Sequence, residues 1–280
     1  NYFWEKTNHR RSYTFYTMIL PYSKWPIYDQ TLTRGISKII SSGKVNYLFG
    51  KYGREFEEKF SEYNQCKFGI GVGNCTDAIT IALRACNIGS GDEVITTSNT
   101  AVPTVTAIVN SGASVKFVDI NEYSLIDVSK ITNAINDKTK AIVPVHLYGQ
   151  SCDMAPIIEL AKKYNALTYL DEVHAVGLYG SQGRGVADLL GVAQDVDIIN
   201  GTLAKAFGVM GGYIASSEKL CDALRTYAPG IIFTTSLPPA IAAGAAASVA
   251  FLKRNQSLRN QHQLQANILK TRFKSVGLPL

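Results

Sequence analysis

The sequence predicts an α/β protein with a mostly parallel sheet and helices on both of its faces. From about residue 54, short apolar segments alternate with segments whose apolar residues recur at helical spacing. This alternation is typical of parallel strands that are joined by covering helices. Three motifs follow directly after predicted strands, and open sheets of this class bind ligands at that edge. The chemistry is therefore expected in the loops after the strands.

The predicted elements follow one another without an internal repeat or a low-complexity linker. The first helix covers 55–63, where Phe56, Phe60 and Tyr63 share one stripe. The expected strands are 67–72, 93–96, 115–118, 141–145, 167–170, 197–200 and 212–215. The other expected helices are 76–86, 102–110, 127–136, 153–164, 216–226, 238–255 and 257–275. Residues 1–17 show no clear periodicity and are assigned to no element.

The composition argues against several classes of protein. No apolar run reaches the ~18 residues that a membrane span needs, and the first residues lack the order of a signal peptide. No membrane partner is therefore expected. Five cysteines, an odd number without ligand-like spacing, predict free thiols in a reducing compartment, the cytoplasm. They suggest neither a disulfide framework nor a metal site.

Part of the net charge of +6 lies late in the sequence. We interpret these basic residues as a solvated helix face, with help for a phosphorylated substrate as the weaker alternative. Few aromatic residues lie between them, so no nucleic-acid surface is predicted. The residues are Lys253, Arg254, Arg259, Lys270, Arg272 and Lys274.

The first motif is the turn Gly73-Asn74-Cys75-Thr76, which lies between a predicted strand and a helix. Free backbone N–H groups and the helix dipole at a helix start favour a phosphate. The hydroxyl of Thr76 can add a hydrogen bond to such an anion. A tight turn with Asn74 or Thr76 as the N-cap residue would look much the same, so the turn alone leaves both interpretations open.

The second motif, Asp171-Glu172-Val173-His174, ends a buried apolar strand. A carboxylate there is costly unless it meets a partner. The protonated pyridine nitrogen of pyridoxal-5′-phosphate (PLP) is such a partner, and His174 would then lie against the ring or reach its phenolic oxygen. The alternative is an aspartate that caps the next turn, beside a core histidine.

The third motif places Lys205 in a loop of small residues directly after a strand, three residues behind Thr202. A lysine in a confined, partly desolvated loop is suited to form a Schiff base, and Thr202 is well placed for the phosphate or a cofactor oxygen. An ordinary surface lysine is the alternative, but glycines and apolar residues surround this one. The three motifs in this order predict a PLP site in which Lys205 carries the cofactor.

Residues 18–167 resemble the DegT/DnrJ/EryC1 sugar aminotransferases. The stretches that carry the resemblance are 47–50, 73–78, 101–108 and 145–150. An Asp-x-Ala-Gln strand end and a Ser-x-x-Pro-x-Lys loop, usual in that family, do not follow. The resemblance implies a PLP enzyme of the aspartate-aminotransferase-like fold (type I), acting on an amino donor and a keto-sugar nucleotide.

Residues 168–280 are instead similar to the 5-aminolevulinate synthases, which are α-oxoamine synthases. The stretches that carry this resemblance are 171–177, 200–208, 227–230 and 233–239. The resemblance implies that Asp171 pairs with the pyridine nitrogen and that Lys205 binds PLP. It also implies a homodimer in which Thr234 and Thr235 reach the phosphate of the neighbouring subunit. The implied reaction condenses glycine with an acyl-CoA, ideally succinyl-CoA.

The two resemblances meet in register at Asp171, which suggests a recombined or engineered chimera within one large domain. The chain stops at Leu280, so the carboxyl-terminal small domain of both families is expected to be absent. Three functions stay open. They are the synthase reaction with Lys205 as general base, transamination of a nucleotide-linked keto-sugar, and a weakly active or inert PLP-binding protein.

Overall fold

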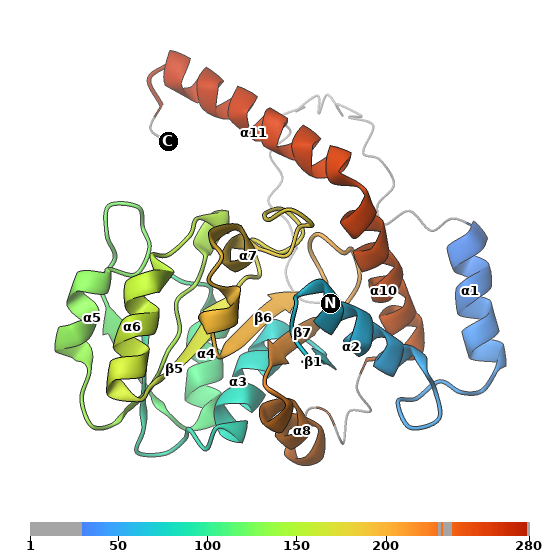
Figure 1. The fold of residues 1–280 in the computed structure, drawn as a ribbon, viewed down its shortest axis with the longest axis horizontal. Coiled ribbons are helices and arrows are strands. Elements are labelled where there is room, and N and C mark those ends of the chain that lie inside the picture. Colours follow the sequence, from blue (N-terminus) through green and yellow to red (C-terminus); the bar gives the residue numbers. More distant parts are fainter. Residues whose placement is uncertain (1–29, 229–230, 232–236, 279–280) are drawn as a thin grey trace, which may run out of the picture.

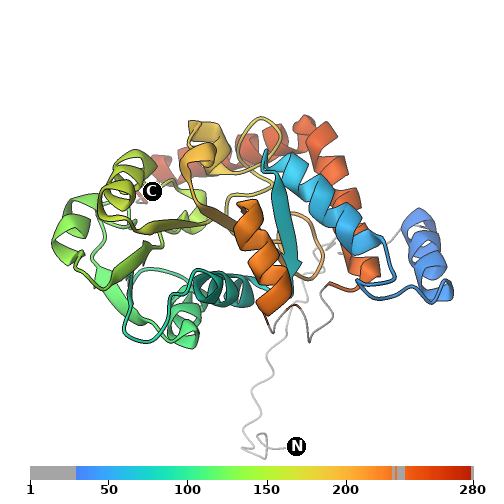
Figure 2. The ribbon, with the colours of Figure 1, turned by 60° about the horizontal axis from the view of Figure 1, so that its bottom comes forward.

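The computed structural model describes residues 30–228, 231 and 237–278 (Figure 1). Residues 1–17, Thr234 and Thr235 lie outside the described residues. The described part forms one sheet of seven strands in the order β1-β7-β6-β5-β4-β2-β3. Figure 2 shows this sheet between two layers of helices. Residues from 18–167 and from 168–280 both supply strands, so these parts share one sheet.

The helices and strands lie close to the predicted ranges. The strands are β1 (Phe68–Val72), β2 (Glu93–Thr97), β3 (Ser114–Val118), β4 (Thr139–Ile142), β5 (Leu167–Asp171), β6 (Ile198–Thr202) and β7 (Gly212–Ser216). The α-helices are α1 (Gln30–Ser41), α2 (Tyr52–Tyr63), α3 (Cys75–Ala85), α4 (Val102–Ser111), α5 (Val128–Ala134), α6 (Met154–Tyr164), α7 (Val186–Leu190), α8 (Glu218–Tyr227), α10 (Pro239–Arg254) and α11 (Gln256–Ser275). The short 3₁₀ turns are η1 (Leu147–Gly149) and η2 (Ala193–Asp195). No prediction covered α1, α7 or either 3₁₀ turn.

The predicted mostly parallel sheet is confirmed, with one strand in the opposite direction. Every strand pair is parallel except the two pairs of β7, with β1 and with β6. The short connection from β6 to β7 explains the exception, because a parallel neighbour needs a long crossover. This connection contains Lys205.

Alternate strand residues enter the cores on opposite faces of the sheet. Tyr169 and Ile198 pack on the face that α3 and α8 cover. Leu170 packs on the other face with α6, and Ile199 packs there with α2 and α10. The direction of each side chain at the strand ends follows from this alternation.

A buried carboxylate ties three elements together near the sheet edge. Glu57 of α2 is 6% exposed. Its Oε1 accepts a hydrogen bond from Gly71 N of β1 at 3.1 Å. Its Oε2 accepts from Arg225 Nη2 of α8 at 3.0 Å and from the Tyr47 hydroxyl at 2.8 Å. Both oxygens of the buried group thus accept hydrogen bonds, as a buried charge requires.

Glu57→Ala is expected to lower the free energy of unfolding by about 3 kcal/mol, because it strands the Arg225 guanidinium and the Gly71 N–H. This is the lower end of the range for a broken buried pair, since the Arg225 side chain is 32% exposed. Urea unfolding measures the change. The control is Glu62→Ala on the same helix, whose carboxylate is 72% exposed and pairs with Lys253. A loss above about 1 kcal/mol is not expected there.

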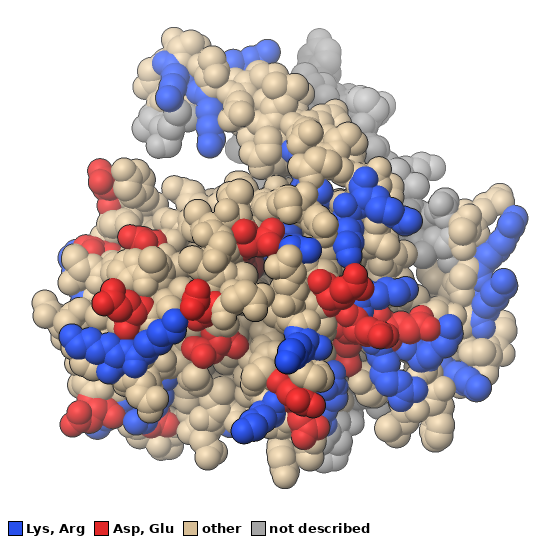
Figure 3. All heavy atoms as spheres, in the orientation of Figure 1, with Lys and Arg blue, Asp and Glu red and all other residues tan. Residues whose placement is uncertain are grey.

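The late basic residues do not all lie on a solvated face. Lys270, Arg272 and Lys274 are exposed on α11, and Figure 3 shows basic side chains there above a body of interspersed charges. Arg259, however, is only 3% exposed. Its guanidinium donates to Leu252 O and Ser181 O, so it joins α10 to the loop after β5. The prediction of a solvated face is therefore wrong for Arg259, because it serves a packing contact. No helix within the described ranges has the length and apolar character of a membrane span.

Candidate active site

Two polar side chains of the predicted motifs lie side by side at the carboxyl ends of β5 and β6. Asp171 and Asn200 are paired in register in these parallel strands, so their side chains point to the same face of the sheet. Thr202 follows two residues later and shares that face. This is the face that α3 covers.

The start of α3 brings all three motifs together. The Cys75 thiol lies near the side chains of Asn200 and Thr202 and within electrostatic reach of Asp171 and Lys205. Burial raises the pKa of this thiol to about 12, and the negative charge of Asp171 adds to the rise. The thiol is therefore protonated at neutral pH and serves as a small packed group.

Glycine lets the turn before α3 approach the sheet. A Cβ on Gly212 would lie 3.1 Å from Gly201 O and 3.3 Å from the carbonyl carbon of Asn74. Neither neighbour is a flexible side chain. The Gly73–Thr76 turn therefore sits directly above the β6–β7 pair because position 212 lacks a side chain.

The structure shows Asn74 as the N-cap residue of α3. Its Oδ1 accepts from Asp77 N at 2.9 Å, and its Nδ2 donates to Asp77 Oδ2 at 2.7 Å. The sequence left two interpretations of this turn open, and the N-cap interpretation is confirmed. The capping bond takes one N–H, and the other N–H groups of the first turn have no partner within the helix. They remain suited to an anion beside Thr76.

Asp171 is a buried carboxylate without a matching cation. It is 5% exposed, and its Oδ1 accepts from Val173 N at 2.9 Å. No ion pair involves it within 30–228, 231 and 237–278. Burial raises the pKa of Asp171 to about 6, against the Val173 hydrogen bond and the charge of Lys205. Such a group fits a protonated ring nitrogen of a ligand such as PLP.

Beside Asp171, the amide of Asn200 is also unsatisfied. Asn200 is fully buried, and neither its Oδ1 nor its Nδ2 has a hydrogen-bond partner within the described chain. Buried amides normally have partners, so this one indicates room for a further polar group. Sequence reasoning named the segment but did not select this residue.

Lys205 lies in the loop between β6 and β7 and is exposed. The prediction of a confined lysine is therefore wrong for this structure, because the pocket that the lysine lines opens outward. This pocket has a volume of about 340 Å³, and its other polar side chains are Tyr148 and His174. Apolar Val173, Val176 and Leu178 complete much of the wall. The lysine thus reaches a mainly apolar space beside the Asp171 strand end.

His174 lies in the same pocket and is fixed by a contact that the sequence did not suggest. Its Nδ1 accepts a hydrogen bond from Tyr148 N at 3.2 Å. Burial, and then the charge of Lys205, lower the pKa of His174 below its ordinary value. The imidazole is therefore neutral at pH 7. Tyr148 was missed, and the only local signal was the glycine that follows it.

Glu172 anchors the loop that follows the strand end. Its side chain is 1% exposed and accepts from Val186 N at 3.1 Å and from Ala187 N at 2.7 Å. Burial raises the pKa of Glu172 to about 7. Since it points to the other face from Asp171, the two adjacent carboxyl groups serve different purposes. One faces the candidate ligand space and the other holds α7.

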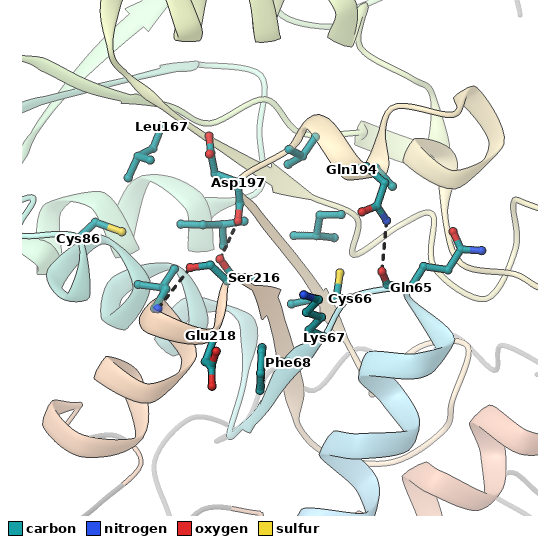
Figure 4. Close-up of a pocket in the computed structure, with 17 residues that line it drawn as sticks. Gln65, Cys66, Lys67, Phe68, Cys86, Leu167, Gln194, Asp197, Ser216 and Glu218 are labelled. Carbon is teal, nitrogen blue, oxygen red and sulfur yellow. Dashed lines mark hydrogen bonds between the residues drawn. The ribbon is translucent and has the colours of Figure 1, made fainter.

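A larger cavity, of about 660 Å³, lies at the opposite end of the sheet (Figure 4). It is near the amino ends of β1, β5 and β6, away from the predicted motifs. In its wall, Oδ2 of Asp197 accepts hydrogen bonds from Thr168 N and Thr168 Oγ1, which hold this carboxylate against β5. Of the predicted site residues, His174 and Lys205 line the smaller pocket instead.

Comparison with known proteins identifies the family. The model of the DegT/DnrJ/EryC1/StrS aminotransferase family matches residues 26–195. The chain belongs to this family. Among solved structures, an aminotransferase from Psychrobacter cryohalolentis matches with 28% identity and a TM-score of 0.68, covering 83% of this chain and 63% of that one. A Sphingomonas wittichii serine palmitoyltransferase matches with 20% identity and a TM-score of 0.77, covering 89% and 65%.

The second resemblance is also confirmed. The 5-aminolevulinate synthase of Paracoccus denitrificans is 58% identical over 146 residues, which is 50% of this chain and 36% of that protein. The chain spans between 30% and 43% of the length of the synthases it matches. The predictions of the type I fold, of both resemblances and of a PLP-enzyme relationship are confirmed. The boundary at residue 167 and the site residues stay predictions.

Proposed function

We propose that the chain binds PLP, whose ring Asp171 and His174 would hold and whose phosphate the Gly73–Thr76 turn and Thr202 would hold. The observation that carries this proposal is the buried, unpaired carboxylate of Asp171 within electrostatic reach of Lys205. Bound PLP supplies an electron sink for a substrate carbanion. Serine palmitoyltransferase structures of the same fold contain PLP.

The residues divide the remaining tasks. Lys205 would hold the cofactor covalently and, once its amine is free, would move the α-proton of the substrate as general base. Asp171 would keep the ring nitrogen protonated, and His174 would orient the ring. Thr234 and Thr235, by resemblance, complete the phosphate site from the second subunit of a homodimer.

The five cysteines, all free, support the predicted cytoplasmic location.

The reaction that we propose is condensation of glycine with an acyl-CoA, ideally succinyl-CoA, to give 5-aminolevulinate. The support is the identity to 5-aminolevulinate synthases, 58% over half of the chain. The family match over residues 26–195 favours a second candidate, amino transfer from an amino donor to a keto-sugar nucleotide. A PLP-binding protein with little turnover is the third possibility.

Borohydride reduction followed by peptide mapping tests the cofactor proposal. The pyridoxyl group is expected on Lys205, and a label on Lys140 or Lys162 would contradict the assignment. Two assays separate the reactions, one with glycine and succinyl-CoA and one with glutamate and a keto-sugar nucleotide. Exchange of the glycine α-proton with solvent tests the first chemical step without a second substrate. Exchange without turnover in either assay would favour the third possibility.

A further inference from the structure

A strained turn holds the imidazole of His174 from one side. Within η1, Tyr148 has a φ of 56°, in the left-handed region that costs free energy for a residue with a side chain. Backbone hydrogen bonds from Leu147 N, Gly149 N and Gln150 N keep the turn closed. Strained residues that their surroundings hold in place are frequent at functional sites.

Tyr148 contacts His174 in two ways. Its backbone N–H donates to His174 Nδ1 at 3.2 Å. Its ring lies parallel to the imidazole within 5°, with the ring centroids 6.1 Å apart. A backbone N–H can only donate, so Nδ1 must be the bare nitrogen, and the proton of the neutral ring lies on Nε2.

The turn packs closely against the segment after β5. Gly149 has a φ of 78°, and a Cβ there would lie 2.7 Å from Tyr179 Cε2 and 3.2 Å from His174 O. The absence of this Cβ lets the turn rest against the segment after β5. A side chain at position 149 would push Tyr148 N away from the imidazole.

The charges around His174 favour its neutral form. Lys205 reaches it from the β6–β7 loop and lowers its pKa together with burial. On its own segment, Asp171 is buried on the α3 face, and Glu172 is engaged with Val186 N and Ala187 N. Neither carboxylate forms an ion pair with the imidazole.

We propose that Tyr148 is a positioning residue, whose backbone N–H fixes His174 with its proton on Nε2 and whose ring holds the imidazole beside Lys205. The Nε2–H group then offers one donor to an acceptor oxygen of the ligand in this pocket. The use of this donor rests on the proposed function. The position of the proton does not, because no cofactor is needed to establish it.

The test is nitrogen NMR of the full chain labelled with ¹⁵N-histidine, without cofactor, at pH 7. The chain has four histidines, and the His174 signal is the one that His174→Gln removes. We expect the Nε2–H form in roughly tenfold excess, the bias that one well-placed hydrogen bond gives. A proton on Nδ1, or an imidazole that is charged at pH 7, would overturn the proposal.

Two glycine variants test whether the turn is the cause. Gly149→Ala is expected to lose most of this excess, because its Cβ displaces the turn. Gly191→Ala is the matched control, since Gly191 also has a positive φ, of 71°, but has nothing within 4 Å of the added Cβ. Equal tautomer ratios in the two variants would overturn the role of the turn. Borohydride mapping to Lys205 reports separately on the proposed function.

Discussion

Lys205→Ala is expected to abolish the covalent cofactor attachment that borohydride reduction traps. It is also expected to slow glycine α-proton exchange by about 10²- to 10⁴-fold. This is the range for the loss of a positioned general base. Lys205 is exposed and lines the pocket that contains His174, so replacement by alanine is expected to leave the backbone of the β6–β7 connection unchanged. Exchange is measured by deuterium uptake at the α-carbon of glycine, with PLP in excess.

The matched control is Lys162→Ala, which removes a lysine that pairs with Asp195 at 3.0 Å and is 65% exposed. Its exchange rate should equal that of the parent. Ethylamine added to the Lys205→Ala variant should restore part of the rate, because a free amine can replace the missing base. Parental exchange in Lys205→Ala without an added amine would refute the assignment.

Asp171→Asn is expected to stabilise the cofactor-free protein at pH 8 while it weakens cofactor binding. The pKa of this carboxyl rises from 3.8 to about 6 on folding, so the folded chain favours the protonated form. Ionisation in the folded state therefore costs stability, by up to about 3 kcal/mol, since one pKa unit is about 1.4 kcal/mol. Asparagine has a similar shape and no charge.

The sign of the pH dependence follows from these two pKa values. Below about pH 3.8 the carboxyl is protonated in both states and contributes no difference. The loss of stability grows as the pH rises from 3.8 to about 6 and is complete above that. The gain of Asp171→Asn in urea unfolding should therefore appear at pH 8 and vanish near pH 3.5.

Asp119→Asn provides the contrast. The pKa of Asp119 is lowered, first by a hydrogen bond from Ile120 N and then by Lys130, so its charge is favoured. No gain at pH 8 is expected there. For Asp171→Asn, absorbance spectra after gel filtration should show less retained PLP. Unchanged retention would argue against a salt bridge to the ring nitrogen.

The fold was largely predictable because strands and helices alternate in a local pattern. Tyr169 and Leu170, for example, are consecutive residues of the apolar strand β5. They pack into the cores on opposite faces of the sheet. The exception, β7, depends on a short connection rather than on periodicity. α7 was missed because it has only five residues and is held by Glu172, a contact outside its own sequence.

The site was predictable only where residues stand directly after strands. Asp171 and Asn200 come together because β5 and β6 are neighbours. The Tyr148–His174 contact joins residues 26 positions apart through a left-handed turn, which no hydrophobic pattern encodes. The exposure of Lys205 also depends on packing, because the composition of a loop does not define how far its pocket opens.

The edge strand β1 has a consequence for how this protein is made. Among the strands of the described residues, its one partner is β7, with Phe68 opposite Ser216. This pairing has to wait until the ribosome has released that distant segment. Pairings between segments so far apart fold slowly, because a long loop must close first. The Gly73–Thr76 turn after β1 is therefore among the last parts to take shape during synthesis. Until then, the backbone of β1 is unpaired and can either be bound by chaperones or aggregate with other chains.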